Sequence, residues 1–263
     1  GVKEVTFLGQ NVNSYGLKRS GEPPFHALLA RAAAVPGLER IRFTTSNPWD
    51  LDEGLVALFA QEPRLASYFH LPVQAGADSM LTRMRRRHTR AEYLRLVEAL
   101  RAARPDIAFS TDIIVGFPGE TQEEHEETLS LLADVGYDFI YSFKYSPRPQ
   151  THALRKYEDD VPEARKSERL QEVQALQRSI TEAALRGYEG RTCSVLVEGA
   201  AAKDSTWLSG RVSQNWTVNF PGDPKHIGAV VDVEVEKALS NSLIGKLVGA
   251  EPRPRRGLLP IVV

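Results

Sequence analysis

The sequence predicts an α/β fold: a partial TIM-type (β/α) barrel followed by a small OB-like antiparallel β-barrel. Up to about residue 149, short β-branched or aromatic runs alternate with longer amphipathic segments, which is typical of repeated βα units around a parallel sheet. After Gly187 the apolar period changes from about 3.6 to about 2 residues, and turn residues separate short runs. We therefore expect one domain at residues 1–186, a second at residues 187–250, and a tail at residues 251–263.

The first domain is predicted to contain five strands, each followed by a helical segment. Two helix starts carry capping boxes, Thr89-x-x-Glu92 and Thr121-x-x-Glu124, in which a hydroxyl and a carboxylate satisfy free backbone donors. The predicted strands cover residues 4–8, 40–44, 68–73, 108–115 and 139–144. The predicted helices cover residues 25–34, 51–61, 90–103, 123–135 and 161–187. In the second domain, strands are expected at residues 193–197, 207–211, 217–220 and 230–235.

Composition limits the classes of protein that this chain can belong to. The 263 residues carry a net charge of −1, so nucleic-acid binding would have to use local clusters of Lys and Arg. No run approaches the roughly 20 apolar residues that span a bilayer, and the start lacks the apolar core of a signal peptide. We therefore expect a cytoplasmic protein without membrane contact. The single cysteine, Cys193, excludes an intrachain disulfide and any site built from several thiolates of this chain.

Polar and glycine-rich loops follow all five predicted strands of the first domain. In a βα barrel these loops share one rim, where ligands bind. Amide and hydroxyl groups suit an adenine, a ribose diol and an amino-acid end, and glycines let backbone approach closely. For any single loop, ordinary turn chemistry explains the same residues. Five such loops on one rim favour a binding site.

Motifs in these loops resemble the bacterial MiaB-type tRNA methylthiotransferases, which are radical-SAM enzymes. Their order and spacing are specific to that family, and the second half resembles its RNA-binding TRAM domain. The motifs of the first half are Leu8-Gly9-Gln10-Asn11-Val12-Asn13-Ser14-Tyr15-Gly16, Arg42-Phe43-Thr44-Thr45-Ser46, His70-Leu71-Pro72-Val73-Gln74, Thr111-Asp112-Ile113-Ile114-Val115-Gly116-Phe117-Pro118-Gly119-Glu120 and Tyr145-Ser146-Pro147-Arg148-Pro149. The motifs of the second half lie at residues 195–198, 208–211, 218–222 and 241–243.

The resemblance implies an enzyme that adds a methylthio group to C2 of isopentenyladenosine beside the tRNA anticodon. One S-adenosylmethionine supplies the methyl group, and reductive cleavage of another yields the radical that abstracts hydrogen. The implied cofactor contacts are Gln10 and Asn11 at the methionine end, Ser46 and Gln74 at the ribose and sulfonium, and Asp112 and Glu120 on the adenine side. For Glu120, a carboxylate that complements a helix dipole is an equal alternative.

The resemblance also implies 4Fe–4S clusters held by cysteines, one of them in a CxxxCxxC loop on a first barrel strand. This chain has neither that loop nor the sulfur-donor domain that precedes it in the family, so we assign it no catalytic or metal-binding residue. It is either a fragment of an enzyme or a catalytically silent RNA-binding protein of the same descent. Without a preceding strand, the edge of the first strand is predicted to pair with another chain or with a second copy.

Basic and aromatic residues at two places are predicted to contact the tRNA anticodon stem-loop. Arg85, Arg86 and Arg148 lie near the third and fifth rim loops, where phosphates need cationic partners. In the second domain, Arg211, Asn215 and Trp216 offer guanidinium, amide and indole groups for unstacked bases. The alternatives are a solvated helix face for the arginines and a core position for Trp216.

Overall fold

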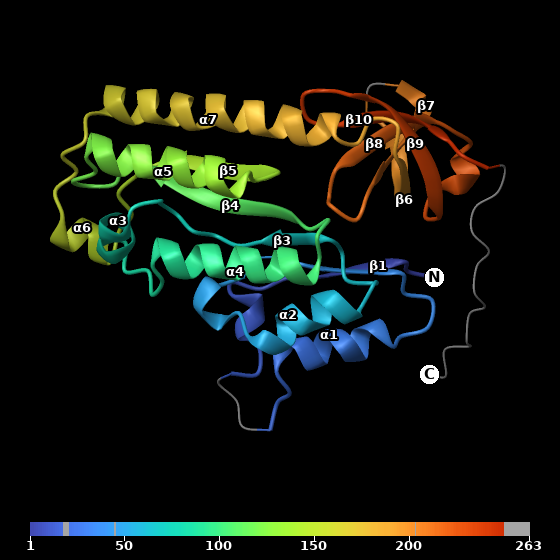
Figure 1. The fold of residues 1–263 in the computed structure, drawn as a ribbon, viewed down its shortest axis with the longest axis horizontal. Coiled ribbons are helices and arrows are strands. Elements are labelled where there is room, and N and C mark those ends of the chain that lie inside the picture. Colours follow the sequence, from blue (N-terminus) through green and yellow to red (C-terminus); the bar gives the residue numbers. More distant parts are fainter. Residues whose placement is uncertain (18–20, 45, 203, 250–263) are drawn as a thin grey trace.

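The structure, a computed structural model, describes residues 1–17, 21–44, 46–202 and 204–249. It has two domains joined by the long helix α7 (Glu163–Arg186), which runs along the first domain and ends at the second (Figure 1). The predicted tail at residues 251–263 lies outside the described residues.

Five parallel strands form the wall of the first domain: β1 (Glu4–Phe7), β2 (Arg40–Phe43), β3 (Tyr68–His70), β4 (Ala108–Val115) and β5 (Phe139–Lys144). Strand β1 pairs with β2, and β3, β4 and β5 pair in that order. A bridge between Ile41 and Leu65 connects the two groups. The five predicted strands are thus confirmed, although β3 ends at His70, two residues before Pro72, which has no N–H to donate to a neighbouring strand.

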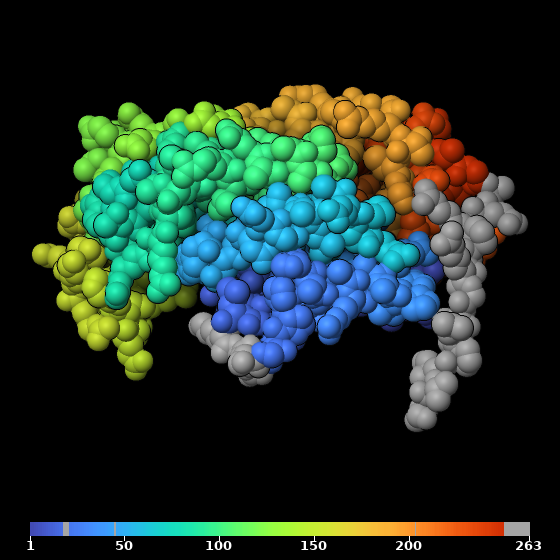
Figure 2. Space-filling view, turned by 60° about the horizontal axis from the view of Figure 1, so that its bottom comes forward, coloured from blue at the N-terminus to red at the C-terminus, as the bar shows by residue number. Residues whose placement is uncertain are grey.

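Helices cover the outer face of this wall. The principal ones are α1 (Phe25–Ala33), α2 (Glu53–Gln61), α4 (Arg90–Ala103) and α5 (Gln122–Val135). The short helices α3 (Asp78–Arg83) and α6 (His152–Lys156) lie at the carboxyl ends of the strands, and 3-10 helices occur at Val12–Ser14 and Pro48–Asp50. Both predicted capping boxes are present, at α4 and α5. Figure 2 shows the surfaces of α1, α2 and α4 side by side. Phe25, Phe43 and Phe69 pack edge-to-face beneath them.

The second domain is a closed five-stranded barrel. Its strands are β6 (Thr192–Ala201), β7 (Asp204–Arg211), β8 (Thr217–Pro221), β9 (Val230–Ala238) and β10 (Leu243–Leu247), with a 3-10 helix at Pro224–His226. The pairs are antiparallel as predicted, except that β8 and β10 close the barrel in parallel. A Cβ at Gly210 would stand 2.3 Å from the Leu196 carbonyl oxygen, so only glycine permits the close crossing of β6 and β7.

The two domains are joined by polar contacts at the amino-terminal ends of the first domain's strands. Arg42 donates to the carbonyl oxygens of Val212 and Ser213 at 2.7 and 3.0 Å, and its Nε donates to Glu4 at 3.0 Å. Arg40 donates to the carbonyl oxygen of Arg211 at 2.8 Å. The second domain therefore lies at the end of the barrel opposite the predicted ligand rim.

Candidate functional site

The inner face of the strand wall carries polar and aromatic side chains, because alternate residues of each strand point away from the helices. Two cavities open on it. One, of about 420 Å³, lies at the carboxyl ends of β4 and β5 and is lined by residues that include Gln74, Asp112, Phe143, Tyr145 and Arg148. The other, of about 400 Å³, lies toward the second domain and is lined by residues that include Arg42, Tyr68, His70, Tyr141, Arg211 and Asn215.

Gln74 has an unusual backbone that the strand wall holds in place. Its φ is 83°, in the left-handed region that non-glycine residues rarely adopt. Its N–H donates to the Asp112 carbonyl oxygen and its own carbonyl oxygen accepts from Ile114, both at 2.9 Å. Such a conformation costs about 1–3 kcal/mol and is concentrated at ligand sites. The predicted residues Gln74 and Asp112 are thus brought together in one cavity.

Asp112 lies at the end of a polar chain that crosses the inner face. Its carboxylate stands 3.6 Å from His70 Nε2, and His70 Nδ1 is 2.7 Å from Ser110 Oγ. Ser110 Oγ is in turn 2.6 Å from the hydroxyl of Tyr68. Burial lowers the pKa of His70, although nearby Asp112 acts in the opposite direction. His70 is a site residue that the predictions from sequence did not include, although it lies in the motif His70-Leu71-Pro72-Val73-Gln74.

The first two rim loops are tied together by a reciprocal pair of hydrogen bonds. Asn13 Oδ1 accepts from the Asn47 N–H at 2.7 Å, and Asn13 Nδ2 donates to the Asn47 carbonyl oxygen at 2.9 Å. Next to this pair, Ser46 is buried, and its hydroxyl has no hydrogen-bond partner among the described residues. Gln10 and Asn11 are exposed on the first loop. The structure does not bring these three residues into the cavity that holds Gln74 and Asp112.

Glu120 is buried between the loop after β4 and helix α7. Its side chain is only 1% exposed, and its Oε2 accepts from the Gly116 N–H at 2.6 Å and from Arg169 at 2.8 Å. Burial raises the pKa of this carboxyl group. Glu120 thus ties the loop after β4 to helix α7, while its Oε1 is buried with no hydrogen-bond partner among the described residues. The two predicted roles of Glu120, cofactor contact and complement to the helix dipole, stay predictions. Glu123 and Glu124 occupy the first turn of α5.

The arginines at residues 83–90, which follow the third rim loop, differ in their surroundings. Arg83 donates to Glu124 and to the Gly119 carbonyl oxygen, and Arg90 pairs with Asp134 at 2.6 Å, so these two hold helices together. Arg85 is exposed in a left-handed conformation, and Arg86 is half-buried. Arg148 is exposed beside the cavity of Gln74 and Asp112.

The three predicted RNA-contacting residues of the second domain are not equivalent. Arg211 donates to the Asn215 side chain at 3.0 Å, and both residues line the cavity that faces the second domain. Trp216, by contrast, is 1% exposed, and its ring lies 3.9 Å from that of Phe139 between centroids. The prediction that Trp216 stacks on RNA is therefore wrong. Its ring is buried at the contact between the two domains, so the alternative prediction of a core position is confirmed.

Side chains that could bind a metal ion are dispersed over the described part of the chain. Within the parts that the structure describes, no three His, Cys, Asp or Glu side chains gather as a metal site requires. Cys193 is half-buried in β6, and burial raises the pKa of its thiol. Among the same residues, no helix is both long and apolar enough to cross a bilayer.

A parallel strand wall with ligand-type cavities on its inner face, joined to a small closed β-barrel, defines a two-domain α/β protein. Comparison with known proteins gives the family. The chain belongs to the radical SAM superfamily, whose family model matches residues 1–132, and a TRAM domain model matches residues 186–248.

Curated relatives confirm the resemblance drawn from the motifs. The tRNA-2-methylthio-N(6)-dimethylallyladenosine synthase of Geobacter metallireducens is 52% identical over 247 residues, which cover 94% of this chain and 56% of that protein. The protein of the same name from Myxococcus xanthus is 48% identical over 99% of this chain and 56% of its own length. The chain thus spans about half the length of the curated relatives it matches. Among solved structures, coproporphyrinogen III oxidase from Escherichia coli, a radical SAM enzyme, is similar with a TM-score of 0.47 and 16% identity, covering 83% of this chain and 55% of that one.

Proposed function

We propose that this chain is part of a tRNA methylthiotransferase that adds a methylthio group to C2 of isopentenyladenosine next to the anticodon. The observation that carries this proposal is the 52% identity over 94% of the chain to a relative named for that reaction. The match extends through the TRAM region as well as the barrel. It favours an enzyme over a catalytically silent RNA-binding protein. A tRNA substrate also agrees with a cytoplasmic location.

S-adenosylmethionine would bind at the rim end of the inner face. The cavity there fits it, because the Phe117 and Tyr145 rings, 4.9 Å apart, suit the adenine. The Asp112 carboxylate suits the cationic sulfonium or amine, and we propose this role for it in place of the adenine-side contact that the motif implied. The Gln74 side chain, held by its constrained backbone, would donate a hydrogen bond to S-adenosylmethionine. Gln10, Asn11 and Ser46 would contact it from the neighbouring loops. When bound, S-adenosylmethionine supplies the methyl group and the hydrogen-abstracting radical.

The 4Fe–4S clusters that the family implies do not fit the residues of this chain. Such clusters are held by several cysteine thiolates, and Cys193 is the single cysteine, in the second domain. We therefore derive no step through a cluster. The contribution of this chain's own residues is to bind and orient S-adenosylmethionine and RNA.

RNA would be held at both ends of the inner face. Arg85, Arg86 and Arg148 supply positive charge near the rim, and the Arg211–Asn215 pair supplies it at the second domain. The anticodon stem-loop is the part of tRNA that presents unpaired bases beside a short duplex.

The test is titration of the chain with an isopentenylated anticodon stem-loop, its unmodified form and an unrelated hairpin at several salt concentrations. We expect tighter binding of the isopentenylated loop, and an affinity that falls as salt rises because phosphate contacts release counterions. The slope of log affinity against log salt concentration should become shallower in the double variant Arg148→Ala/Arg211→Ala, by the equivalent of about two phosphate contacts. Arg178→Ala, an exposed arginine on α7, is the matched control. Equal affinity for all three RNAs would reject the proposed substrate.

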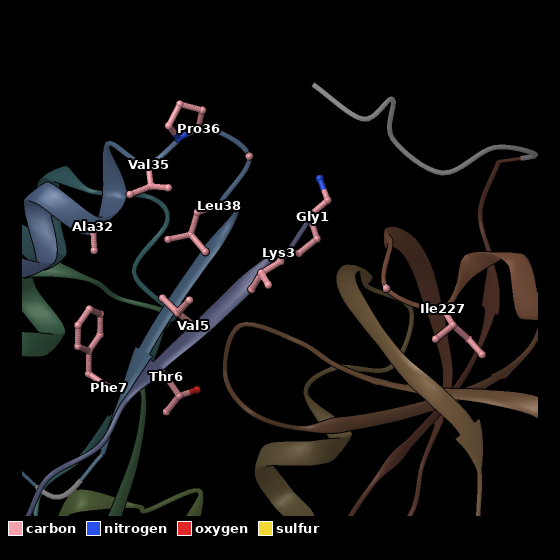
Figure 3. Close-up of a pocket in the computed structure, with 13 residues that line it drawn as sticks. Gly1, Lys3, Val5, Thr6, Phe7, Ala32, Val35, Pro36, Leu38 and Ile227 are labelled. Carbon is pink, nitrogen blue, oxygen red and sulfur yellow. The ribbon is translucent and has the colours of Figure 1, made fainter. Parts of the chain in front are cut away.

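We further propose that the outer edge of β1 pairs with another strand, either from a second copy or from another chain. A groove of about 680 Å³ lies beside it, lined by apolar residues that include Val5, Phe7, Leu38 and Ile227 (Figure 3). Lys3 and Phe7 direct their carbonyl oxygens toward β2. Because successive residues of a strand direct their backbone groups to opposite sides, the N–H of Thr6 points away from β2, toward the free edge. Sedimentation at rising concentration should show association that Thr6→Pro weakens. A chain that remains a monomer would exclude the second copy.

A further inference from the structure

Every inner-face position of strand β5 carries an aromatic side chain. Tyr145, just after the strand ends, continues this row. These residues are Phe139, Tyr141, Phe143 and Tyr145. The two end rings have partners, since Phe139 stacks on Trp216 and Tyr145 packs against Phe117 at 4.9 Å. The two middle rings are open to solvent, with 51% of Tyr141 and 54% of Phe143 exposed. The strand therefore holds two rings ready for contact on a concave face.

Exposure of two neighbouring aromatic rings is costly unless something binds them. Each ring carries a large apolar area, and contiguous exposed apolar area marks interaction sites. The His70 ring meets Tyr141 at 5.8 Å with an interplanar angle of 78°, which is an edge contact. The rings also join the two cavities of the inner face, because Tyr141 lines the cavity toward the second domain and Phe143 lines the cavity at the rim.

The charges around the two rings favour an anionic partner. Arg148 is exposed beside Phe143 in the rim cavity, and Arg211, 42% exposed, shares the other cavity with Tyr141. The carboxylates in these cavities already have cationic neighbours. Glu4 is paired with Arg40 and Arg42, Glu198 with Arg211, and Asp112 lies close enough to Arg86 for the two charges to interact.

We infer that Tyr141 and Phe143 form a stacking shelf for two unpaired RNA bases, with Arg148 and Arg211 contacting the phosphates on either side. The inference rests on the proposed function and names the residues that hold the loop of its RNA substrate. Side chains two positions apart on a strand are separated by roughly 7 Å, which suits two splayed neighbouring bases. Sheet-borne aromatic rings that stack two or three bases are an established mode of single-strand recognition.

The alternative occupant is a protein segment, and the surroundings fit it less well. A buried peptide would need a closed apolar groove with partners for its backbone. Here the rings lie between two exposed arginines and beside His70 and Asp112. This pattern of rings between cations matches a polyanion with flat apolar bases.

The test uses an anticodon-type hairpin whose loop carries 2-aminopurine, a base that loses fluorescence when it stacks. A duplex of equal length without unpaired bases serves as the control RNA. We expect Tyr141→Leu and Phe143→Leu each to weaken hairpin binding on the order of tenfold and to abolish the fluorescence loss. Duplex binding, which uses phosphates, should stay at the wild-type level. Tyr141→Phe and Phe143→Tyr, which keep a ring, should rescue the fluorescence loss.

Two outcomes would overturn the inference in different ways. If wild-type chain binds neither RNA in a salt-dependent manner, the proposed function fails and the shelf fails with it. If wild-type chain binds the hairpin but both leucine variants keep its affinity and the fluorescence loss, the shelf alone is wrong, and a protein segment becomes the better occupant. Leu239→Ser, at an exposed site on the β9–β10 loop, controls for general loss of surface hydrophobicity.

Discussion

Asp138 illustrates how one carboxyl group near the domain junction couples stability to pH. It precedes β5, and its Oδ2 accepts from the Phe109 N–H at 2.9 Å. Burial raises the pKa of Asp138 from 3.8 to about 6. Between these two values the folded chain keeps a proton that the unfolded chain has lost, so the free energy of unfolding falls as pH rises through this range. The effect is at most about 3 kcal/mol.

The variant Asp138→Asn removes this titration. Between about pH 4 and about pH 6.5, the fall in the free energy of unfolding that Asp138 causes in the wild type should be absent from the variant, as measured by urea denaturation. Other carboxyl groups titrate equally in both proteins, so the difference between the two pH profiles isolates Asp138. Parallel profiles would contradict the assignment.

At the level of single residues, the sequence predicted which positions lie near the site better than it predicted what they do. Gln74 and Asp112 share a cavity, as their motifs suggested. Glu120 and Trp216 are buried because their partners come from distant segments. Arg169 lies 49 residues beyond Glu120, and Phe139 belongs to the other domain. A motif fixes neighbours along the chain, whereas burial depends on packing that a single motif does not encode.

The loop between β3 and α3 approaches helix α5 so closely that only glycine fits at residue 76. A Cβ there would stand 2.3 Å from the Glu127 carbonyl oxygen and 2.5 Å from Thr128 Cα, while the Gly76 N–H donates to Thr128 Oγ1 at 2.9 Å. We expect Gly76→Ala to lower the free energy of unfolding by about 1–3 kcal/mol, because the helix backbone has to move. Gly199→Ala, where a Cβ meets nothing within 4 Å, is the control. Equal loss of stability in the two variants would contradict this close packing.

Elements with strong local signals were predictable, and those without them were not. Helices α4 and α5 begin where their capping boxes predicted, because the cap is written in four adjacent residues. Helices α3 and α6 have six and five residues, too few to show an apolar period. The parallel closure of the second barrel by β8 and β10 was also missed, because strand pairing depends on contacts between distant segments.

At the scale of the whole molecule, the docking of the two domains was beyond sequence reasoning. It depends on the guanidinium groups of Arg40 and Arg42, which donate to backbone carbonyl oxygens that any sequence would present. Arg42 is 7% exposed, and burial lowers the pKa of its guanidinium group although nearby Glu4 opposes this. The contact keeps Arg211 and Asn215 facing Tyr141 across one cavity. The two ends of the proposed RNA site are therefore held in a fixed relation.

The substitution Arg42→Lys tests this docking. A lysine ammonium is compact and cannot reproduce the planar fork that reaches Glu4, Val212 and Ser213 together. Hydrogen bonds from charged groups contribute about 1.5–3 kcal/mol each, so we expect a loss of stability of about 3 kcal/mol or more. Because the lost contacts are between domains, calorimetry should resolve two unfolding transitions in the variant where the wild type shows one, and proteases should cut sooner between α7 and β6. Arg178→Lys, on the exposed face of α7, should behave as the wild type. If Arg42→Lys unfolds like this control, Arg42 does not hold the domains together, and the contacts of Arg40 and of Phe139 with Trp216 are sufficient.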